Sequence, residues 1–230
     1  MGAARKRRLA PEREETEDTA ERTVSLRHKA YEAIKHRIIT LAYRPGTYLN
    51  ETLICADLGI GRTPVHMAME RLMLENLVEV MPRKGIIVKP ISVDEINAIT
   101  EARRINEPAA AALAAARASD EELKRLRSVV RQTKTTPPHK IEQFIALDRE
   151  FHSTIREAAR NPVLAQILAT LHDRSLRHWF ISLSDANRQH NVAVEHEAVV
   201  RALEARDSAS AEAAMREHID SLANARLRYW

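Results

Sequence analysis

The sequence predicts a mainly α-helical protein with two parts, an N-terminal unit that includes a small β-hairpin and a C-terminal bundle of helices. The 230 residues include only 5 Gly and 4% aromatic residues, and long stretches are rich in Ala, Leu, Arg and Glu, which favour helices. With 44% hydrophobic and 30% charged residues, the chain can form one large or two small cores. Apolar residues also recur at the three- and four-residue steps of amphipathic helices.

Composition excludes several other classes of protein. The single cysteine, Cys55, cannot close an intramolecular disulfide, and the longest apolar run, residues 109–116, is far shorter than the ~20 residues of a membrane span. The basic cluster at residues 5–8 is not followed by the apolar stretch of a secretory signal. We therefore expect a cytoplasmic protein.

Charge divides the chain into three segments. Residues 1–22 carry six Lys/Arg and six Asp/Glu without apolar periodicity, and we expect a flexible charged arm there. Residues 91–230 carry twenty of each, whereas residues 23–90 carry ten basic and six acidic residues. The net positive charge of +4 thus belongs to the middle segment, which suits a polyanion such as nucleic acid.

The middle segment opens with two predicted helices. The first begins near Ser25 and ends before the turn at residues 44–46, with one apolar face formed by Ala30, Ile34, Ile38 and Leu41. Asn50 can cap a short second helix, and Gly59 suits the left-handed residue that ends it.

A third helix and a hairpin follow. Residues 61–64 predict a turn and a helix start, with Thr63 as the cap and Pro64 at the first helical position. The inward face of this helix consists of Val65, Met69, Leu72, Met73 and Leu77. Residues 78–80 and 86–88 are short β-type runs around a basic turn. This order of elements is that of a winged helix-turn-helix, which we place at residues 23–90.

The C-terminal segment, residues 91–230, has a helical pattern throughout. Its helix starts are marked by the capping pairs Ser92/Glu95 and Ser119/Glu122 and by the further caps Asn161 and Asp207. We expect about six helices in an antiparallel bundle.

These patterns resemble a known family. Residues 49–88, with the motif RTPV, an amphipathic helix, ENLVEV and a wing containing glycine, are similar to the DNA-binding domain of the GntR family of bacterial transcription regulators. The helices that follow resemble the all-helical ligand-binding FCD domain of the FadR-like branch of that family. The resemblance implies a DNA-binding regulator and not an enzyme.

In a helix-turn-helix the first residues of the second helix reach base edges in the major groove. Here these residues are Arg62, Thr63 and His66, and the guanidinium of Arg62 suits bidentate donation to guanine. The family usually has Arg where this chain has His66, which is a weaker donor that depends on pH. Lys84 and Gly85 at the hairpin tip suit the minor groove or the DNA backbone.

A metal site is predicted in the helical segment. Asp148 and His152 are four residues apart and share a helix face. His196 and His218 each lie eleven residues from Asp207, so a turn there would place both imidazoles at the same height of an antiparallel pair. The four residues also match the Asp and three His that bind metal in many FCD domains. Such a ligand set suits Zn²⁺ or Ni²⁺.

A metal with an open coordination position can hold a carboxylate, and the helix from Ser92 offers polar groups near it. Arg103 and Asn106 lie on an otherwise apolar stripe, and Arg is a planar donor for a carboxylate. An internal salt bridge between Arg103 and Glu107 is the competing interpretation, and the adjacent Arg104 is the alternative for the pocket. A further cluster is best explained by helix packing, and consists of His172, His178, Trp179 and Phe180.

The sequence and the resemblance together predict a homodimeric regulator that binds a palindromic DNA operator and responds to a small organic acid. The resemblance, and not the sequence pattern, implies that the regulator is a repressor. A helical metalloenzyme is one alternative, with bases sought among Glu150, Glu195 and Glu197. A DNA-binding regulator with a purely structural metal is another.

Overall fold

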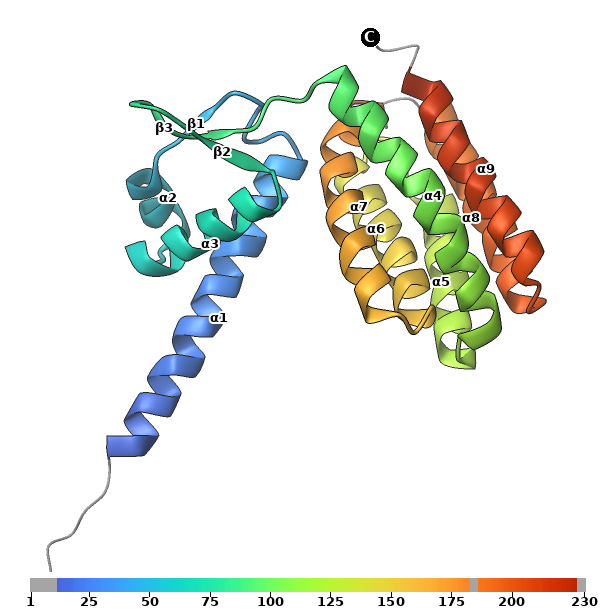
Figure 1. Ribbon diagram of the computed structural model, residues 1–230, viewed down its shortest axis with the longest axis horizontal. Helices are drawn as coiled ribbons and strands as arrows, with labels where there is room; N and C mark the ends of the chain where they lie inside the picture. Colours follow the sequence, from blue (N-terminus) through green and yellow to red (C-terminus); the bar gives the residue numbers. More distant parts are fainter. Residues whose placement is uncertain (1–11, 183–185, 227–230) are drawn as a thin grey trace, which may run out of the picture. The chain divides into compact units, whose positions relative to one another are not determined.

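The computed structural model describes residues 12–182 and 186–226, with side chains described for residues 25–180 and 187–222. The mainly helical fold class is confirmed: long helices make up most of these residues, and a single small sheet lies near the N-terminal end (Figure 1).

The described chain forms two compact units. The first unit contains the residues up to Arg37 and residues 46–89, and the second contains residues 38–45 and the residues from Pro90 onward. The short stretch 38–45 belongs to the helical unit because Ile39, at the end of the first helix, is buried in its core.

The first unit is a winged helix-turn-helix, as predicted. Its strands form one antiparallel sheet in the order β1-β3-β2, in which Val80 pairs with Ile86 across the wing. Its elements are α1 (Glu12–Ile39), β1 (Tyr48–Leu49), α2 (Glu51–Leu58), α3 (Arg62–Leu74), β2 (Val78–Met81) and β3 (Gly85–Val88).

The ends of α2 agree with the predicted signals. The side chain of Asn50 accepts from the backbone N–H groups of Thr52 and Leu53, and Gly59 takes the left-handed φ of 63° that ends the helix. These caps fix the turn that leads into α3.

The predicted start of α3 was wrong by two residues. Gly61 is the cap, with extended backbone angles and no side-chain hydrogen bond, and Arg62 is the first helical residue. Thr63 and Pro64 therefore occupy the second and third helical positions. Proline is tolerated there because the N–H groups of the first helical turn have no partner within the helix.

Helix α1 differs from the predicted arm at the N-terminus. It begins at Glu12, so residues 12–22 are helical, whereas residues 1–11 lie outside the described residues. The Glu, Ala and Arg residues of this stretch favour a helix even without an apolar face, so its balanced charge did not make it a flexible arm.

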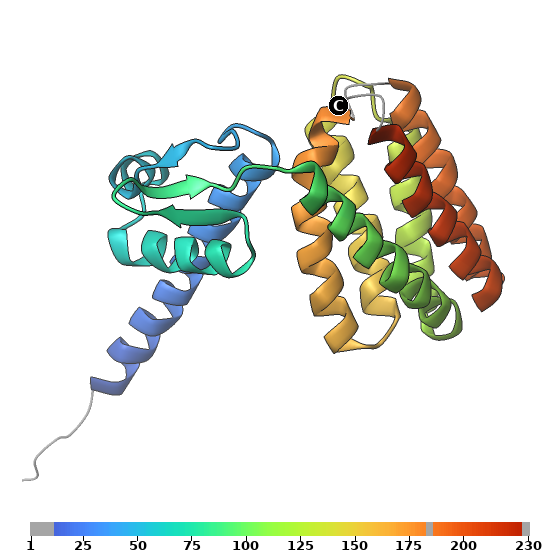
Figure 2. The same cartoon turned by 45° about the horizontal axis from the view of Figure 1, so that its top comes forward.

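The second unit is a bundle of six helices, which confirms the predicted number within its described residues. The helices lie side by side, and α4 contacts α6, α7, α8 and α9 (Figure 2). They are α4 (Val93–Arg117), α5 (Asp120–Thr135), α6 (Ile141–Ala158), α7 (Pro162–Ser182), α8 (Ala186–Glu204) and α9 (Ser208–Arg226).

The connections in the bundle follow the predicted caps. Ser119 and Glu122 form a reciprocal capping box, and the side chain of Asp207 accepts from the N–H of Ser210 at the start of α9. Among the described helices, none is both long and apolar enough to cross a membrane.

Candidate functional site

The first turns of α3 present polar side chains to solvent. Arg62, Thr63 and His66 are exposed, whereas Val65 and Met69 on the other face are buried. The helix therefore offers its N-terminal end, which carries the positive pole of the helix dipole, to an anionic partner.

The wing adds a second exposed basic element. Lys84 and Gly85 are exposed at its tip, where the N–H of Lys84 donates to the carbonyl of Met81 at 3.0 Å. Gly85 has a φ of 92°, which glycine adopts readily. Arg83, a residue of the predicted basic turn, is also exposed there.

Two carboxylates flank His66. Its Nδ1 lies 3.0 Å from Oε1 of Glu51 at the start of α2, and its Nε2 lies 3.6 Å from Oε1 of Glu70 one turn along α3. The hydrogen bond to Glu51 raises the pKa of the exposed His66 imidazole above its usual value. Glu51 and Glu70 thus favour the charged form of His66.

A polar cluster holds α3 against α1. The Tyr31 hydroxyl donates to the carboxylate of Glu75 at 2.8 Å, the Lys35 ammonium lies 2.9 Å from the same carboxylate, and the Arg71 guanidinium lies over the Tyr31 ring. Burial raises the pKa of Tyr31 to about 12, so its hydroxyl stays a donor. These contacts link residues about 40 positions apart and fix the orientation of the reading helix within its unit.

The second candidate site lies inside the helical bundle. His152, His196 and His218 come from α6, α8 and α9, are at most 2% exposed, and have ligand nitrogens within 4.8 Å of one another. Asp148, 1% exposed, places Oδ1 3.5 Å from His196 Nε2 and 3.9 Å from His152 Nε2. The structure thus brings together all four residues of the predicted metal site.

The turn between α8 and α9 explains why two of them meet. Because the turn consists of residues 205–207, next to the predicted position at Asp207, His196 and His218 lie at nearly the same height, with ring centroids 4.7 Å apart. The interval of eleven residues on each side of Asp207 was sufficient to predict this contact.

Two glutamates, the buried Glu107 and the partly buried Glu195, orient two of the histidines. Glu195 lies 2.8 Å from Nδ1 of His218, and Glu107 lies 2.8 Å from Nδ1 of His152. Each carboxylate fixes the Nδ1–H tautomer, so the lone pair on Nε2 faces the cluster, as metal-binding histidines require.

Each of these glutamates is held in turn by a buried arginine. Arg103 Nε lies 2.5 Å from Glu107, and Arg188 Nη1 lies 3.1 Å from Glu195 and also donates to Ser221. The Arg103 and His152 contacts hold the pKa of Glu107 well below its usual range, although burial alone would raise it. The positioning role of the two glutamates was not predictable from the sequence, because each glutamate and its histidine lie on different helices.

Arg103 both forms the internal salt bridge and keeps a donor free. Its Nη1 donates to Ser175 Oγ at 2.9 Å, but its buried Nη2 has no hydrogen-bond partner. Arg104, by contrast, is exposed and pairs with Asp220, and the Asn106 amide donates to the backbone oxygen of Ala102 at 2.7 Å. Of the residues considered for a carboxylate pocket, Arg103 therefore has the best position.

The cluster fits a divalent metal ion on its own chemistry. Both oxygens of Asp148, both nitrogens of His196, and the Nε2 atoms of His152 and His218 are buried without a hydrogen-bond partner. Buried polar atoms of this kind require a partner. Burial lowers the pKa of His152, His196 and His218 and so favours neutral imidazoles, the form that binds metal. Burial also raises the pKa of Asp148 to about 6, which a nearby cation would oppose.

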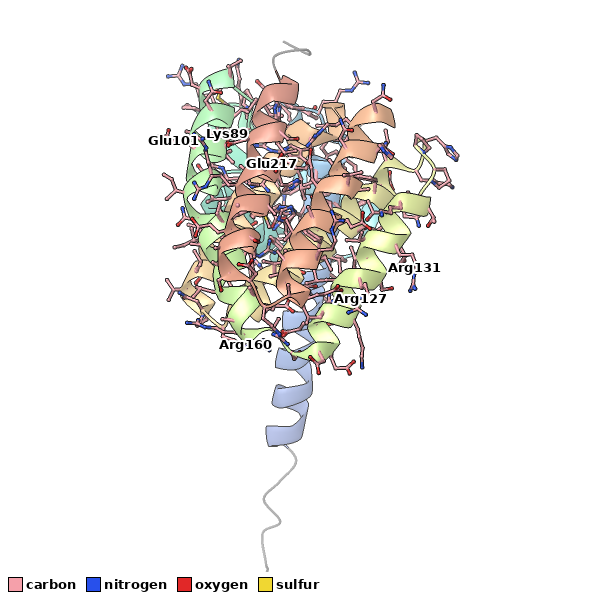
Figure 3. All side chains as sticks on the ribbon, turned by 90° about the vertical axis from the view of Figure 1, so that its right-hand side faces the viewer. Lys89, Glu101, Arg127, Arg131, Arg160 and Glu217 are labelled. Atoms are coloured by element: carbon pink, nitrogen blue, oxygen red, sulfur yellow. The ribbon has the colours of Figure 1, made fainter. Side chains whose placement is uncertain are left out.

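The remaining acidic candidates have other partners. Glu150 lies 2.8 Å from Arg125, and Glu197 lies 2.6 Å from Lys134, in both cases toward the outside of the bundle. In Figure 3, Arg127 and Arg131 likewise extend outward from α5. Neither Glu150 nor Glu197 is placed to act as a base at the histidine cluster.

A winged helix-turn-helix joined to a helical bundle is an architecture found in DNA-binding transcription regulators. The chain belongs to the GntR family of bacterial regulatory proteins and carries an FCD domain. The gntR family model matches residues 26–88, and the FCD domain model matches residues 98–221. The relatives are transcription regulators, which confirms the prediction that the protein is not an enzyme.

Individual relatives agree with this assignment. An uncharacterised helix-turn-helix regulator of Agrobacterium vitis is 44% identical to this chain over 82 residues. The match covers 36% of this chain and 48%, about half, of that relative's length. The transcriptional repressor RspR of Escherichia coli is 23% identical over 87% of this chain and 88% of its own. The solved structure of E. coli McbR/YncC has a TM-score of 0.78 at 23% identity, covering 89% of this chain and 99% of that one, which shows the shared fold.

Proposed function

We propose that this regulator is a homodimeric repressor whose affinity for a palindromic operator is controlled by a small organic acid bound at a metal centre in the FCD domain. Two-fold pairing is expected because one winged unit reads too few bases for useful specificity. The observation that carries the proposal is the enclosed set of unpaired metal-ligand atoms with the free Nη2 of Arg103 in the same bundle.

In this proposal Asp148, His152, His196 and His218 hold Zn²⁺ or Ni²⁺. The bound ion supplies an open coordination position for a carboxylate, and the Arg103 guanidinium donates to that carboxylate. The acid changes DNA affinity to the extent that it prefers a dimer geometry in which the two reading helices no longer match the two half-sites.

The DNA side of the proposal assigns the reading of bases to Arg62, Thr63 and His66, and contact with the backbone or minor groove to Lys84 and Gly85. All five are exposed in the winged unit. Arg62, at the first position of α3, has the side chain best suited to a guanine.

The proposal is tested with a DNA duplex selected by the protein from a random pool. A panel of small carboxylic acids is titrated into the complex of the zinc-loaded protein with this duplex, and release is followed by fluorescence anisotropy. At least one acid should lower DNA affinity, and chelation of the metal should abolish its effect. If no acid changes DNA affinity, the effector assignment is wrong and the metal is structural.

The Arg62→Ala variant should bind the selected duplex more weakly by about 1 to 3 kcal/mol, the value of one good bidentate contact with a base. Its metal content and folding should be unchanged. Arg131→Ala is the matched control, because it removes one exposed arginine from the helical unit. Equal operator affinity of Arg62→Ala and the wild type would contradict the choice of reading residue.

Operator affinity should fall as the pH rises from about 6 to 8, the range that includes the usual pKa of histidine. The pKa of His66 is raised in the free protein, so this side chain is charged at the lower pH and loses its charge as the pH passes its pKa. Affinity for phosphate or an acceptor base edge is lost with the charge. His66→Gln should flatten this part of the pH profile, and an identical slope in the variant would rule out His66 as its source.

A further inference from the structure

His172, on α7, is a buried imidazole that the four-ligand metal site does not use. It is 1% exposed, and neither of its ring nitrogens has a hydrogen-bond partner. Helix packing, our interpretation from the sequence, accounts for its burial but leaves two polar atoms unsatisfied. The position of this side chain therefore requires another explanation.

Its nearest carboxylate is the one at the centre of the metal site. Nε2 of His172 lies 3.6 Å from Oδ2 of Asp148, while Oδ1 of Asp148 faces His196 at 3.5 Å. The two oxygens of Asp148 thus face different neighbours, and neither has a hydrogen bond.

The backbone of α7 at His172 is held in place. Ser175 Oγ donates to the carbonyl oxygen of His172 at 2.7 Å, and Arg103 Nη1 donates to Ser175 Oγ at 2.9 Å. The imidazole therefore extends from a fixed turn of the helix toward Asp148.

We propose that His172 is a positioning residue of the metal site, and that its Nε2–H donates to Oδ2 of Asp148 so that only Oδ1 binds the ion. A movement of about 0.5 Å brings the pair into hydrogen-bond range. The hydrogen bond satisfies the second oxygen and prevents Asp148 from binding through both, which keeps a coordination position open. This inference rests on the proposed metal centre.

A second metal ion is the competing role for His172. Ligand atoms of Glu107, His152 and His172 lie within 4.8 Å of one another. However, one oxygen of Glu107 is taken by Arg103 Nε at 2.5 Å and the other lies 2.8 Å from His152 Nδ1. An ion there would displace a buried arginine from its partner, so the geometry favours the hydrogen bond to Asp148.

The test compares two substitutions in the full chain. His172→Phe keeps the ring volume but removes the donor, whereas His172→Gln keeps an N–H near the position of Nε2. His178→Phe is the control, because it removes another buried imidazole from α7, six residues away on a different helix face. Zn²⁺ affinity is measured by chelator competition, metal stoichiometry by elemental analysis, and ligand geometry from the absorption spectrum of the Co²⁺-loaded protein.

We expect His172→Phe to bind one ion per chain with about 10- to 100-fold lower affinity and an altered Co²⁺ spectrum. His172→Gln should recover most of the affinity and the wild-type spectrum, and His178→Phe should match the wild type. Unchanged affinity and spectrum in His172→Phe would overturn the proposal, as would two ions in the wild type and one in this variant. A wild-type chain that binds no ion would instead overturn the metal centre itself, and this inference with it.

A measurement on the wild type covers the case in which His172→Phe does not fold. In ¹⁵N spectra of the zinc-loaded protein, His172 should be neutral with its proton on Nε2. A proton on Nδ1, or a metal-bound Nε2, would contradict donation to Asp148.

Discussion

The His218→Ala variant is expected to lose its bound metal. Loss of a carboxylate that supports a metal ligand can lower metal affinity by about 100-fold, and loss of the ligand itself should lower Zn²⁺ affinity further. The substitution removes one of the three imidazoles. It also removes one partner of Glu195, the His218 Nδ1 atom that lies 2.8 Å from its carboxylate. Any response to a carboxylic acid should disappear with the metal, whereas binding of the metal-free protein to the selected duplex should persist. Elemental analysis and DNA titration measure the two effects separately.

His190→Ala is the matched control for His218→Ala. His190 lies on the neighbouring helix α8 but is exposed, so its removal changes the histidine content without touching the buried cluster. Metal stoichiometry in His218→Ala equal to that of this control would show that the ligand set is wrong.

The Glu107→Leu variant is expected to lower the free energy of unfolding of the metal-free protein by about 3 to 5 kcal/mol. Arg103 and Glu107 are 2% and 5% exposed, and removal of the carboxylate leaves the guanidinium buried without a counter-charge. Urea unfolding of chelated protein measures the loss. Trp179 fluorescence is a suitable signal, because the Arg103 guanidinium lies near its ring.

The double variant Arg103→Met/Glu107→Leu separates the charge effect from lost packing. With both charges replaced by apolar groups, most of the lost stability should return, since a buried ion pair often contributes little net stability over apolar side chains of similar size. A double variant as unstable as Glu107→Leu would show that the cost comes from volume and not from the unpaired charge.

Local signals made much of the fold predictable from the sequence. The Asn50 cap and Gly59 stop define α2, the Ser119 cap defines α5, and the turn at Asp207 places His196 beside His218. Each of these features depends on a few neighbouring residues or on equal chain lengths around a turn.

The supporting contacts could not be predicted in the same way. Glu107 meets His152 across 45 positions of the chain, and His172 approaches Asp148 from a different helix, so no short spacing reveals either contact. The start of α3 was predicted wrongly because of a local signal. Thr63 is a residue type that often caps helices, but the structure has Gly61 at the cap. The sequence left two roles open for Arg103, a salt bridge with Glu107 or donation to a bound carboxylate. In the structure Arg103 forms the salt bridge and its Nη2 has no hydrogen-bond partner.

The central claim, a metal-anchored carboxylate sensor, is tested most directly by thermal melting. Purified protein is melted with a panel of small carboxylic acids, once loaded with Zn²⁺ and once after chelation. An acid present at about 100 times its dissociation constant should stabilise the folded protein by about 2.7 kcal/mol. The account predicts a rise in melting temperature for at least one acid in the zinc-loaded sample and none after chelation. An equal rise in both samples, or no rise in either, would contradict it.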